Sequence, residues 1–227
     1  MNTQQISKLL TLLNENKLEE LRNELTQHLL NKSDKPKADL VKAVKNFLNY
    51  SHKINGDARP TLCTVQHKRG KQFIISGYSA FLFDNYIKEL DELANTVEES
   101  ACLEIYNIIN SNAEYSTLTE NDMLILKNIK KYIAFYKSQA GYDKKLNRQD
   151  VYFNNKVFDA KILAQVVEIM ANELDTIQIT NNEFFKPTQI KSDSILGVVL
   201  PLRTTDEITN KIIDTTNNFI NELKGAN

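Results

Sequence analysis

Two stretches of this chain repeat one order of elements, a helix followed by short strands, and this repeat limits the fold more than any other feature. The stretches centre on Arg59–Asp84 and Val151–Arg203, and an amphipathic helical pattern leads the strands of each. The repeat predicts one α+β domain made of two helix-plus-strands halves. Because the chain has 227 residues, of which 41% are hydrophobic, it can bury one sizeable core with helical additions.

The first half is predicted to begin with a helix that ends near Tyr50. The apolar face of this helix consists of Leu40, Val41, Val44, Phe47 and Leu48, and the opposite face carries Lys42, Lys45, Asn46 and Asn49. The residues that follow predict strands at Thr61–His67, Gln72–Ser76 and Ser79–Phe83, with a hairpin turn at Arg69–Gly70.

The second half repeats this plan after a short leading strand. Val151–Phe153 is the predicted leading strand, Asn154–Asn155 a turn, and Phe158–Leu174 an amphipathic helix. Three further strands are predicted at Thr176–Thr180, Phe184–Ile190 and Leu196–Pro201.

Helical segments are predicted before, within and after the two halves. We expect an N-terminal helical extension at residues 1–34, a helical insertion at 86–149 within a domain that spans 35–203, and a terminal amphipathic helix at 204–227. Leucines at three- and four-residue spacing in the extension favour packing on the main domain, and a short dimerising hairpin is the alternative. In the insertion, Thr117 and Glu120 form a plausible capping box, and Gly141–Asp150 has the polar, basic composition of a loop.

Charge and cysteine content exclude several classes of protein. A net charge of −1 argues against a protein whose whole surface binds nucleic acid, and it leaves local basic patches open. Cys63 and Cys102 lie in apolar segments, which favours buried reduced thiols, and their spacing does not suit a zinc site. Neither a signal peptide nor a membrane span is predicted, so we expect a soluble cytoplasmic protein.

The patterns that catalysis requires are scarce in this chain. His28, His52 and His67 make no local pair of metal ligands, and Gly70 and Gly77 do not compose a phosphate-binding loop. We therefore expect a non-enzymatic protein with no catalytic residues, metal or cofactor. An enzyme whose site lies in the insertion is a weaker alternative.

Sequence motifs in both halves are similar to those of one known family. In the first half the motif is RPTLCTVQHKRGKQFIISGYSAFLF, and in the second half the motifs are FDAKILAQVVEIM, FKPTQI and ILGVVLPLR. In order and spacing they resemble the motifs of the bacterial sliding clamp of DNA polymerase, one domain of which is built from two helix-plus-strands halves. The resemblance covers about half of the chain and implies a single clamp-like domain, of a kind that a phage or mobile element carries.

The resemblance also implies a surface for partner proteins. In the clamp family two motifs, from adjacent domains, form an apolar groove that binds partner peptides. The matching residues here are Gly77 and Tyr78 in the first half and Val199, Leu200, Pro201, Leu202 and Arg203 in the second. An arginine of the family's first motif is missing, and in a single domain the two motifs are expected to meet only across a head-to-tail interface. The terminal helix is expected to occupy this groove or to dock a second copy.

The resemblance further implies contact with duplex DNA through lysines on the helices. Clamp helices present basic side chains to phosphates, which gives weak, salt-dependent contact without sequence preference. Candidate residues are Lys42 and Lys45 in the first helix, Lys127, Lys130 and Lys131 in the insertion, and Lys144, Lys145 and Arg148 in the loop. The alternative for each cluster is an ordinary solvated helix face.

Together these observations predict a clamp-like accessory protein of DNA replication or repair. Its expected partners are replication or repair proteins and double-stranded DNA, with no membrane, and a homo-oligomer is compatible with the single domain. The alternative is a module that keeps a clamp-like fold but binds only proteins, for example as an inhibitor of a host factor; the near-neutral net charge favours it.

Overall fold

The computed structural model describes residues 17, 38–50, 64–68, 71–76, 79–90, 93, 113–139, 148–180 and 186–225. The chain divides into two compact units, Met1–Lys42 and Ala43–Asn227. Several sequence predictions fall outside the described residues: the leucine stripe at 5–31, the turn at 69–70, Gly77, Tyr78, Lys144 and Lys145. Every strand of the described residues belongs to the second unit.

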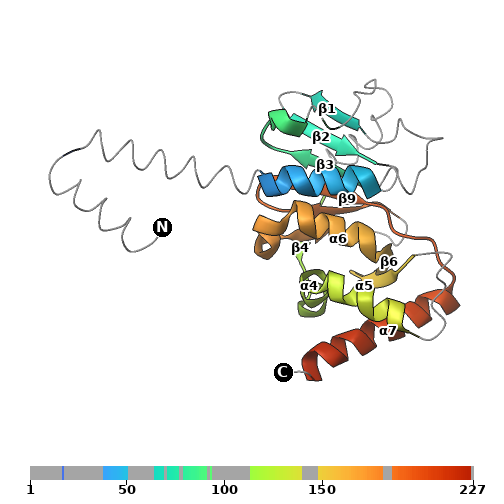
Figure 1. The fold of residues 1–227 in the computed structure, drawn as a ribbon. Coiled ribbons are helices and arrows are strands. Elements are labelled where there is room, and N and C mark those ends of the chain that lie inside the picture. Colours follow the sequence, from blue (N-terminus) through green and yellow to red (C-terminus); the bar gives the residue numbers. More distant parts are fainter. Residues whose placement is uncertain are drawn as a thin grey trace. The chain divides into compact units, whose positions relative to one another are not determined.

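An antiparallel sheet organises the second unit (Figure 1). Within the described residues it has seven strands, in the order β1-β2-β3-β9-β8-β7-β4. Their bounds are β1 Thr64–Lys68, β2 Lys71–Ile75, β3 Ser79–Phe83, β4 Tyr115–Thr117, β7 Gln178–Thr180, β8 Thr188–Lys191 and β9 Ile195–Val199. With the helices described below, this sheet confirms the predicted α+β class.

The two predicted halves join along β3 and β9 at the centre of this sheet. One half contributes the meander β1-β2-β3 and the other the meander β7-β8-β9. The register pairs Ser79 with Val199 at one end of the seam and Phe83 with Ile195 at the other. Each half therefore completes the sheet of the other.

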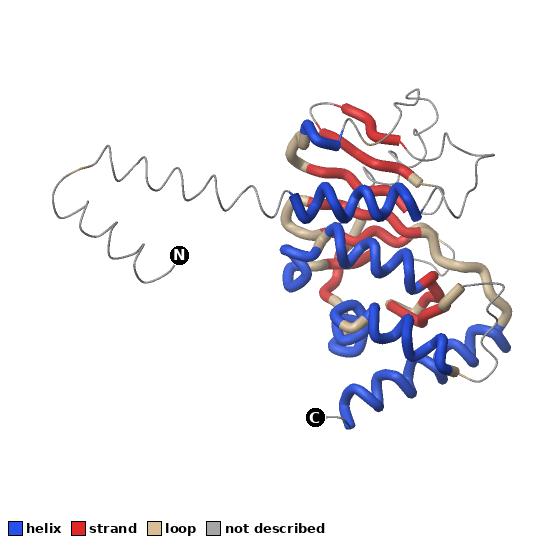
Figure 2. The backbone as a smooth tube through the Cα atoms, in the orientation of Figure 1, coloured by secondary structure: helices blue, strands red, loops and turns tan. Residues whose placement is uncertain are grey.

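Two helices cover one face of the sheet (Figure 2). Residues 43–50, the part of helix 38–50 that lies in the second unit, and α6 (Ala160–Ile169) each precede one of the meanders. The rings of Phe47 and Phe81 meet edge to face, with their centroids 5.2 Å apart. Alternate residues of the strands point to the opposite face, where Phe73, Ile75, Ala80, Leu82 and Val198 form a second buried cluster.

Three further helices lie against the β5–β6 hairpin, which is outside the main sheet. It pairs β5 (Asp150–Phe153) with β6 (Lys156–Asp159) through a turn at Asn154 and Asn155, whose φ angles are 47° and 60°. Positive φ at both positions is typical of the tight turns that join hairpin strands. Against this hairpin lie α4 (Glu120–Lys127), α5 (Ile129–Ser138) and α7 (Asp206–Gly225).

The apolar stripe of α7 packs inside the same chain. Ile212, Phe219 and Ile220 are buried, and the Phe219 ring lies 5.2 Å from that of Tyr132 and 5.3 Å from that of Phe135, both on α5. Contrary to the expectation, the part of the stripe at Ile212, Phe219 and Ile220 is covered by α5 and β5 and does not occupy a groove, whereas Ile208 is 44% exposed. No helix of the described residues is both long and apolar enough to cross a membrane.

Three local predictions need correction. Phe158 lies in strand β6, so the helix predicted to start there begins at Ala160; α6 ends at Ile169 and a 3-10 helix, η4 (Ala171–Thr176), follows. The insertion contains a strand, β4, which pairs with β7 at the edge of the sheet. Thr117 belongs to that strand, and the N-cap of α4 is Thr119, whose hydroxyl accepts a hydrogen bond from the Asp122 amide at 3.1 Å.

Candidate functional site

The outward surfaces of residues 43–50, α6 and α5, with the adjoining α4 and η4, form what we call the helical face. Lysines are distributed over it: Lys45, Lys130, Lys131 and Lys137 are exposed and Lys161 is half-buried. Most of these lysines come from the insertion and not from the two helices that lead the halves. The face therefore carries basic groups, of which α6 contributes only Lys161.

Glu168 lies where α6, α5 and residues 43–50 meet. One of its carboxylate oxygens lies 2.7 Å from Nζ of Lys130 on α5, and the other accepts a hydrogen bond from Nδ2 of Asn46 at 3.4 Å. A second carboxylate, that of Asp175 on η4, lies 2.8 Å from Nζ of Lys127 on α4. Two lysines proposed to contact phosphate are thus already paired with acidic residues.

A tyrosine, an aspartate and a lysine connect helix 38–50 to the start of α6. The Tyr50 hydroxyl donates to Oδ2 of Asp159 at 3.3 Å, and Oδ1 of Asp159 accepts the Lys161 amide at 2.8 Å as the N-cap of α6. Nζ of Lys161 lies 6.0 Å from the centroid of the Tyr50 ring. Burial raises the pKa of Tyr50, as does the neighbouring Asp159 carboxylate, so the phenol remains the proton donor.

The structure does not place the remaining predicted DNA-binding residues on this face. Arg148 pairs with the buried carboxylate of Asp150, at 2.7 Å from Nε to Oδ1, and so stabilises the start of β5. Lys42 belongs to the first unit, and Lys144 and Lys145 lie outside the described residues. Of the predicted set, Lys45, Lys127, Lys130 and Lys131 are the exposed lysines that the structure places in the second unit.

The flanks of the two partner-binding motifs meet within one chain. Ser79, which follows Gly77 and Tyr78 in sequence, is the register partner of Val199. The amide of Ser76, on the other side of the motif, donates to the Ser79 carbonyl at 2.7 Å. Ser79 and Val199 are therefore neighbours in one sheet without a head-to-tail interface, whereas Gly77 and Tyr78 themselves lie outside the described residues.

Residues 199–203 differ widely in exposure. Val199 is buried in β9, whereas 38% of Leu200 is exposed and Arg203 is exposed. Pro201 and Leu202 are half-buried, and the Leu202 amide donates to the Val157 carbonyl at 2.8 Å, which ties the segment to β6. The segment thus presents Leu200 and Arg203 to solvent from a fixed backbone.

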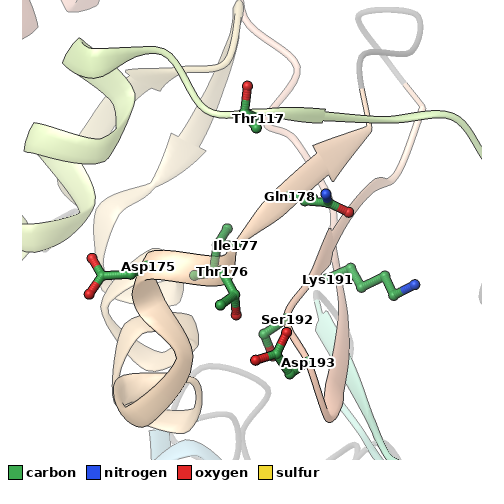
Figure 3. Close-up of a pocket in the computed structure, with 8 residues that line it drawn as sticks. All are labelled: Thr117, Asp175, Thr176, Ile177, Gln178, Lys191, Ser192 and Asp193. Atoms are coloured by element: carbon green, nitrogen blue, oxygen red, sulfur yellow. The ribbon is translucent and has the colours of Figure 1, made fainter.

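A polar hollow of about 440 Å³ lies beside the edge of the sheet (Figure 3). Its lining residues are Thr117, Asp175, Thr176, Ile177, Gln178, Lys191, Ser192 and Asp193. The side chains of Asp175 and Lys191 point to opposite sides. Asp175 pairs with Lys127, the Lys191 amine lies 5.6 Å from the Tyr115 ring centroid, and the Ser192 hydroxyl donates to the Ile195 carbonyl. These lining residues do not compose the nucleophile, base and orienting group that catalysis needs.

Other buried ionisable groups have structural partners. Lys156 is 1% exposed, and its amine donates to Oγ1 of Thr188 at 3.0 Å and to the Lys186 carbonyl at 3.2 Å. Burial lowers its pKa to about 8. Within the described part of the chain, no group of three or more His, Cys, Asp and Glu side chains could hold a metal ion.

Sequence reasoning missed the acidic residues of the helical face as functional candidates. Neither Glu168 nor Asp175 is among the candidate residues that the sequence motifs and basic clusters indicate. The available signal was the placement of Glu168 on the polar side of an otherwise apolar helix. Its partners, Asn46 and Lys130, lie far from it in sequence, so the contacts themselves carry no local signal.

Comparisons with models of protein families, with curated proteins and with solved structures find no match for this chain.

Proposed function

We propose that this protein is a non-enzymatic, clamp-like accessory protein of DNA replication or repair that binds duplex DNA and partner proteins. The observation that carries the proposal is the joining of two helix-plus-three-strands halves along β3 and β9, with one helix of each half on the same face. The sequence motifs resemble those of the sliding clamp, one domain of which is built on the same plan. The order of the motifs and the arrangement of the halves therefore support the same proposal.

The helical face is the proposed DNA-binding surface. Exposed lysines on residues 43–50, α4 and α5 can contact phosphates without reading base edges. With few such contacts and a net charge of −1, affinity for DNA is weak and falls as salt rises, by a slope set by the number of contacts. Contact of this kind fits an accessory protein that holds other proteins on DNA irrespective of sequence.

The proposed partner-binding surface is the segment after β9. Leu200 offers an exposed apolar side chain, and Arg203, three residues later, offers a positive charge. The hydrogen bond from the Leu202 amide to the Val157 carbonyl holds the backbone between them. An apolar anchor with a charged neighbour suits a short peptide of a replication or repair protein. Since the chain supplies one domain, encircling DNA would require several copies in a closed ring.

Binding of a fluorescent duplex to the intact protein, followed by anisotropy over a range of salt, tests the proposal. Charge reversal of Lys127, Lys130 and Lys131 to Glu should weaken binding at about 0.1 M salt by tenfold or more, and it should reduce the slope against log salt by about 0.9 for each phosphate that the variant no longer neutralises. Lys211→Glu on α7 is the matched control for each of the three reversals made singly. Unchanged affinity in the triple variant would remove α4 and α5 from the DNA-binding surface.

A specific observation favours a module that binds only proteins. Of the insertion lysines Lys127, Lys130 and Lys131, two are paired with carboxylates. Lys127 pairs with Asp175, and Lys130 pairs with Glu168. Removal of residues 204–227 would be a poor test of partner binding, because α7 buries Ile212 and Phe219 in the core. Leu200→Asp and Arg203→Glu are better variants: loss of partner capture from both, in a protein that does not bind duplex DNA even at low salt, would favour the protein-only module.

A further inference from the structure

Glu168 is held at the centre of the helical face by donors from two other helices. Nζ of Lys130 on α5 contacts one carboxylate oxygen at 2.7 Å, and Nδ2 of Asn46 on helix 38–50 donates to the other at 3.4 Å. The Glu168 side chain is 26% exposed, whereas that of Lys130 is 71% exposed. The carboxylate is therefore fixed among the helices while the amine that it pairs with extends toward solvent.

Asp175 forms a second carboxylate–lysine pair one helix away, and this pair is more exposed than the first. Its carboxylate, on η4, lies 2.8 Å from Nζ of Lys127 on α4. The Asp175 side chain is 85% exposed and that of Lys127 is 48% exposed, so both groups are open to solvent. Two carboxylates from neighbouring elements, α6 and η4, thus face two lysines from the insertion.

We propose that Glu168 and Asp175 compete with phosphate for Lys130 and Lys127 and thereby limit the affinity of the helical face for duplex DNA. This inference rests on the proposed function, because it assigns a control of affinity to the same surface. A lysine that is already paired with a carboxylate has a smaller positive potential to offer a phosphate. The carboxylate also repels the phosphate that would replace it.

The geometry of Glu168 makes this competition stronger than that of an ordinary surface pair. An exposed ion pair between two long side chains exchanges readily with solvent and is screened by salt. Glu168 is instead partly buried and held by the Asn46 amide as well as by Lys130. Its negative charge consequently stays in the middle of the face even when Lys130 turns toward DNA.

Three variants of the full chain test the proposal: Glu168→Gln, Asp175→Asn and the double substitution. Both changes keep the size of the side chain and remove its charge. The probe is a short fluorescent duplex of mixed sequence, titrated at salt concentrations from about 0.05 to 0.2 M. We expect Glu168→Gln to bind roughly three- to tenfold more tightly than the wild type at about 0.1 M salt, with a slope against log salt that is steeper by about 0.9. Asp175→Asn removes a carboxylate from a more exposed pair, so its gain should be smaller.

Two further variants show whether the gain passes through the named lysines. Glu207→Gln is the matched control, because it removes a carboxylate that lies 2.8 Å from Nζ of Lys211 in the same kind of pair on α7. It should leave DNA affinity unchanged. Adding Lys130→Met to Glu168→Gln should abolish the gain that Glu168→Gln produces.

The outcomes separate this inference from the proposed function. If the wild type binds DNA and the three variants bind with the same affinity and salt slope as the wild type, the inference is overturned and the proposed function stands. An equal gain from Glu207→Gln would also overturn the inference, because net charge alone would then explain it. If neither the wild type nor any variant binds at the lowest salt, both fail. Binding that is detectable only in the charge-removed variants supports the inference.

Discussion

Gly197 on β9 lies directly opposite Phe81 on β3, at the centre of the seam between the two halves. A Cβ atom at position 197 would lie 3.2 Å from Cε1 of Phe81 and 3.2 Å from Cε of Met170, which follows α6. The missing side chain thus makes room for the Phe81 ring, which in turn packs edge to face on Phe47. One glycine lets a helix from each half approach the same point on the sheet.

Gly197→Ala should therefore destabilise the protein. The added methyl group meets a fully buried ring, and overpacking of this kind costs about 1–3 kcal/mol, although movement of the flexible end of Met170 reduces the effect. The free energy of unfolding in denaturant measures it. Gly225→Ala is the control, since no atom lies within 4 Å of the added Cβ, and no loss is expected there. Equal effects at the two positions would contradict this account of the seam.

Thr119→Ala should destabilise α4 by about 1 kcal/mol, because the Thr119 hydroxyl accepts the Asp122 amide at the helix N-terminus. Thr117→Ala, two residues earlier in exposed strand β4, should change the free energy of unfolding by less than about 0.5 kcal/mol. The comparison uses one substitution type at two exposed threonines. A larger loss at Thr117 would support the cap predicted from the sequence and not the one in the structure.

A buried hydroxyl network connects α5, β5 and α7. The Tyr132 hydroxyl donates to the Asp150 carbonyl at 2.7 Å and lies 3.2 Å from Oγ1 of Thr216, which accepts the Tyr152 amide at 3.1 Å. Tyr132→Phe and Thr216→Val should each lower the free energy of unfolding in denaturant by about 1–3 kcal/mol, because each leaves a buried polar group without its partner. In a double-mutant cycle the two losses should not add. Strict additivity would show that the hydroxyls act independently.

The buried Lys156 predicts a dependence of stability on pH. Burial lowers its pKa to about 8 in the folded protein, against about 10.4 in an unfolded chain. Between these values the unfolded state binds more protons, so the free energy of unfolding should rise with pH through this window, and the cost of burying the charge is complete below pH 8. Lys156→Met should remove this rise. Parallel pH curves for the two proteins would contradict the lowered pKa.

Much of the sheet could be predicted from local patterns. The strand at Ser79–Phe83 matches β3, and the turn at Asn154–Asn155 is present with positive φ at both residues, because asparagine tolerates that conformation. The short strand β6 was missed since all four of its residues are buried, so it shows no alternation, and Phe158 continues the helical spacing of Ile162. β4 has three residues, too few for a strand pattern.

The candidate site was only partly predictable. Exposed lysines on amphipathic helices are visible in the sequence, and Lys45, Lys130 and Lys131 are indeed exposed. Their pairing was not visible, because Lys130 and Glu168 are brought together only by the packing of α5 on α6. The position of α7 was missed for the same reason: an apolar stripe shows that a helix is buried and does not show against what.

The mass of the protein in solution, measured by light scattering without and with duplex DNA at low and at physiological salt, tests the central claim most directly. The account predicts a closed oligomer of about six copies, the number of domains that the clamp resemblance implies for a ring, and a further mass increase when DNA binds at low salt. A monomer or simple dimer whose mass is unchanged by DNA would contradict it and leave the protein-only module as the function to pursue.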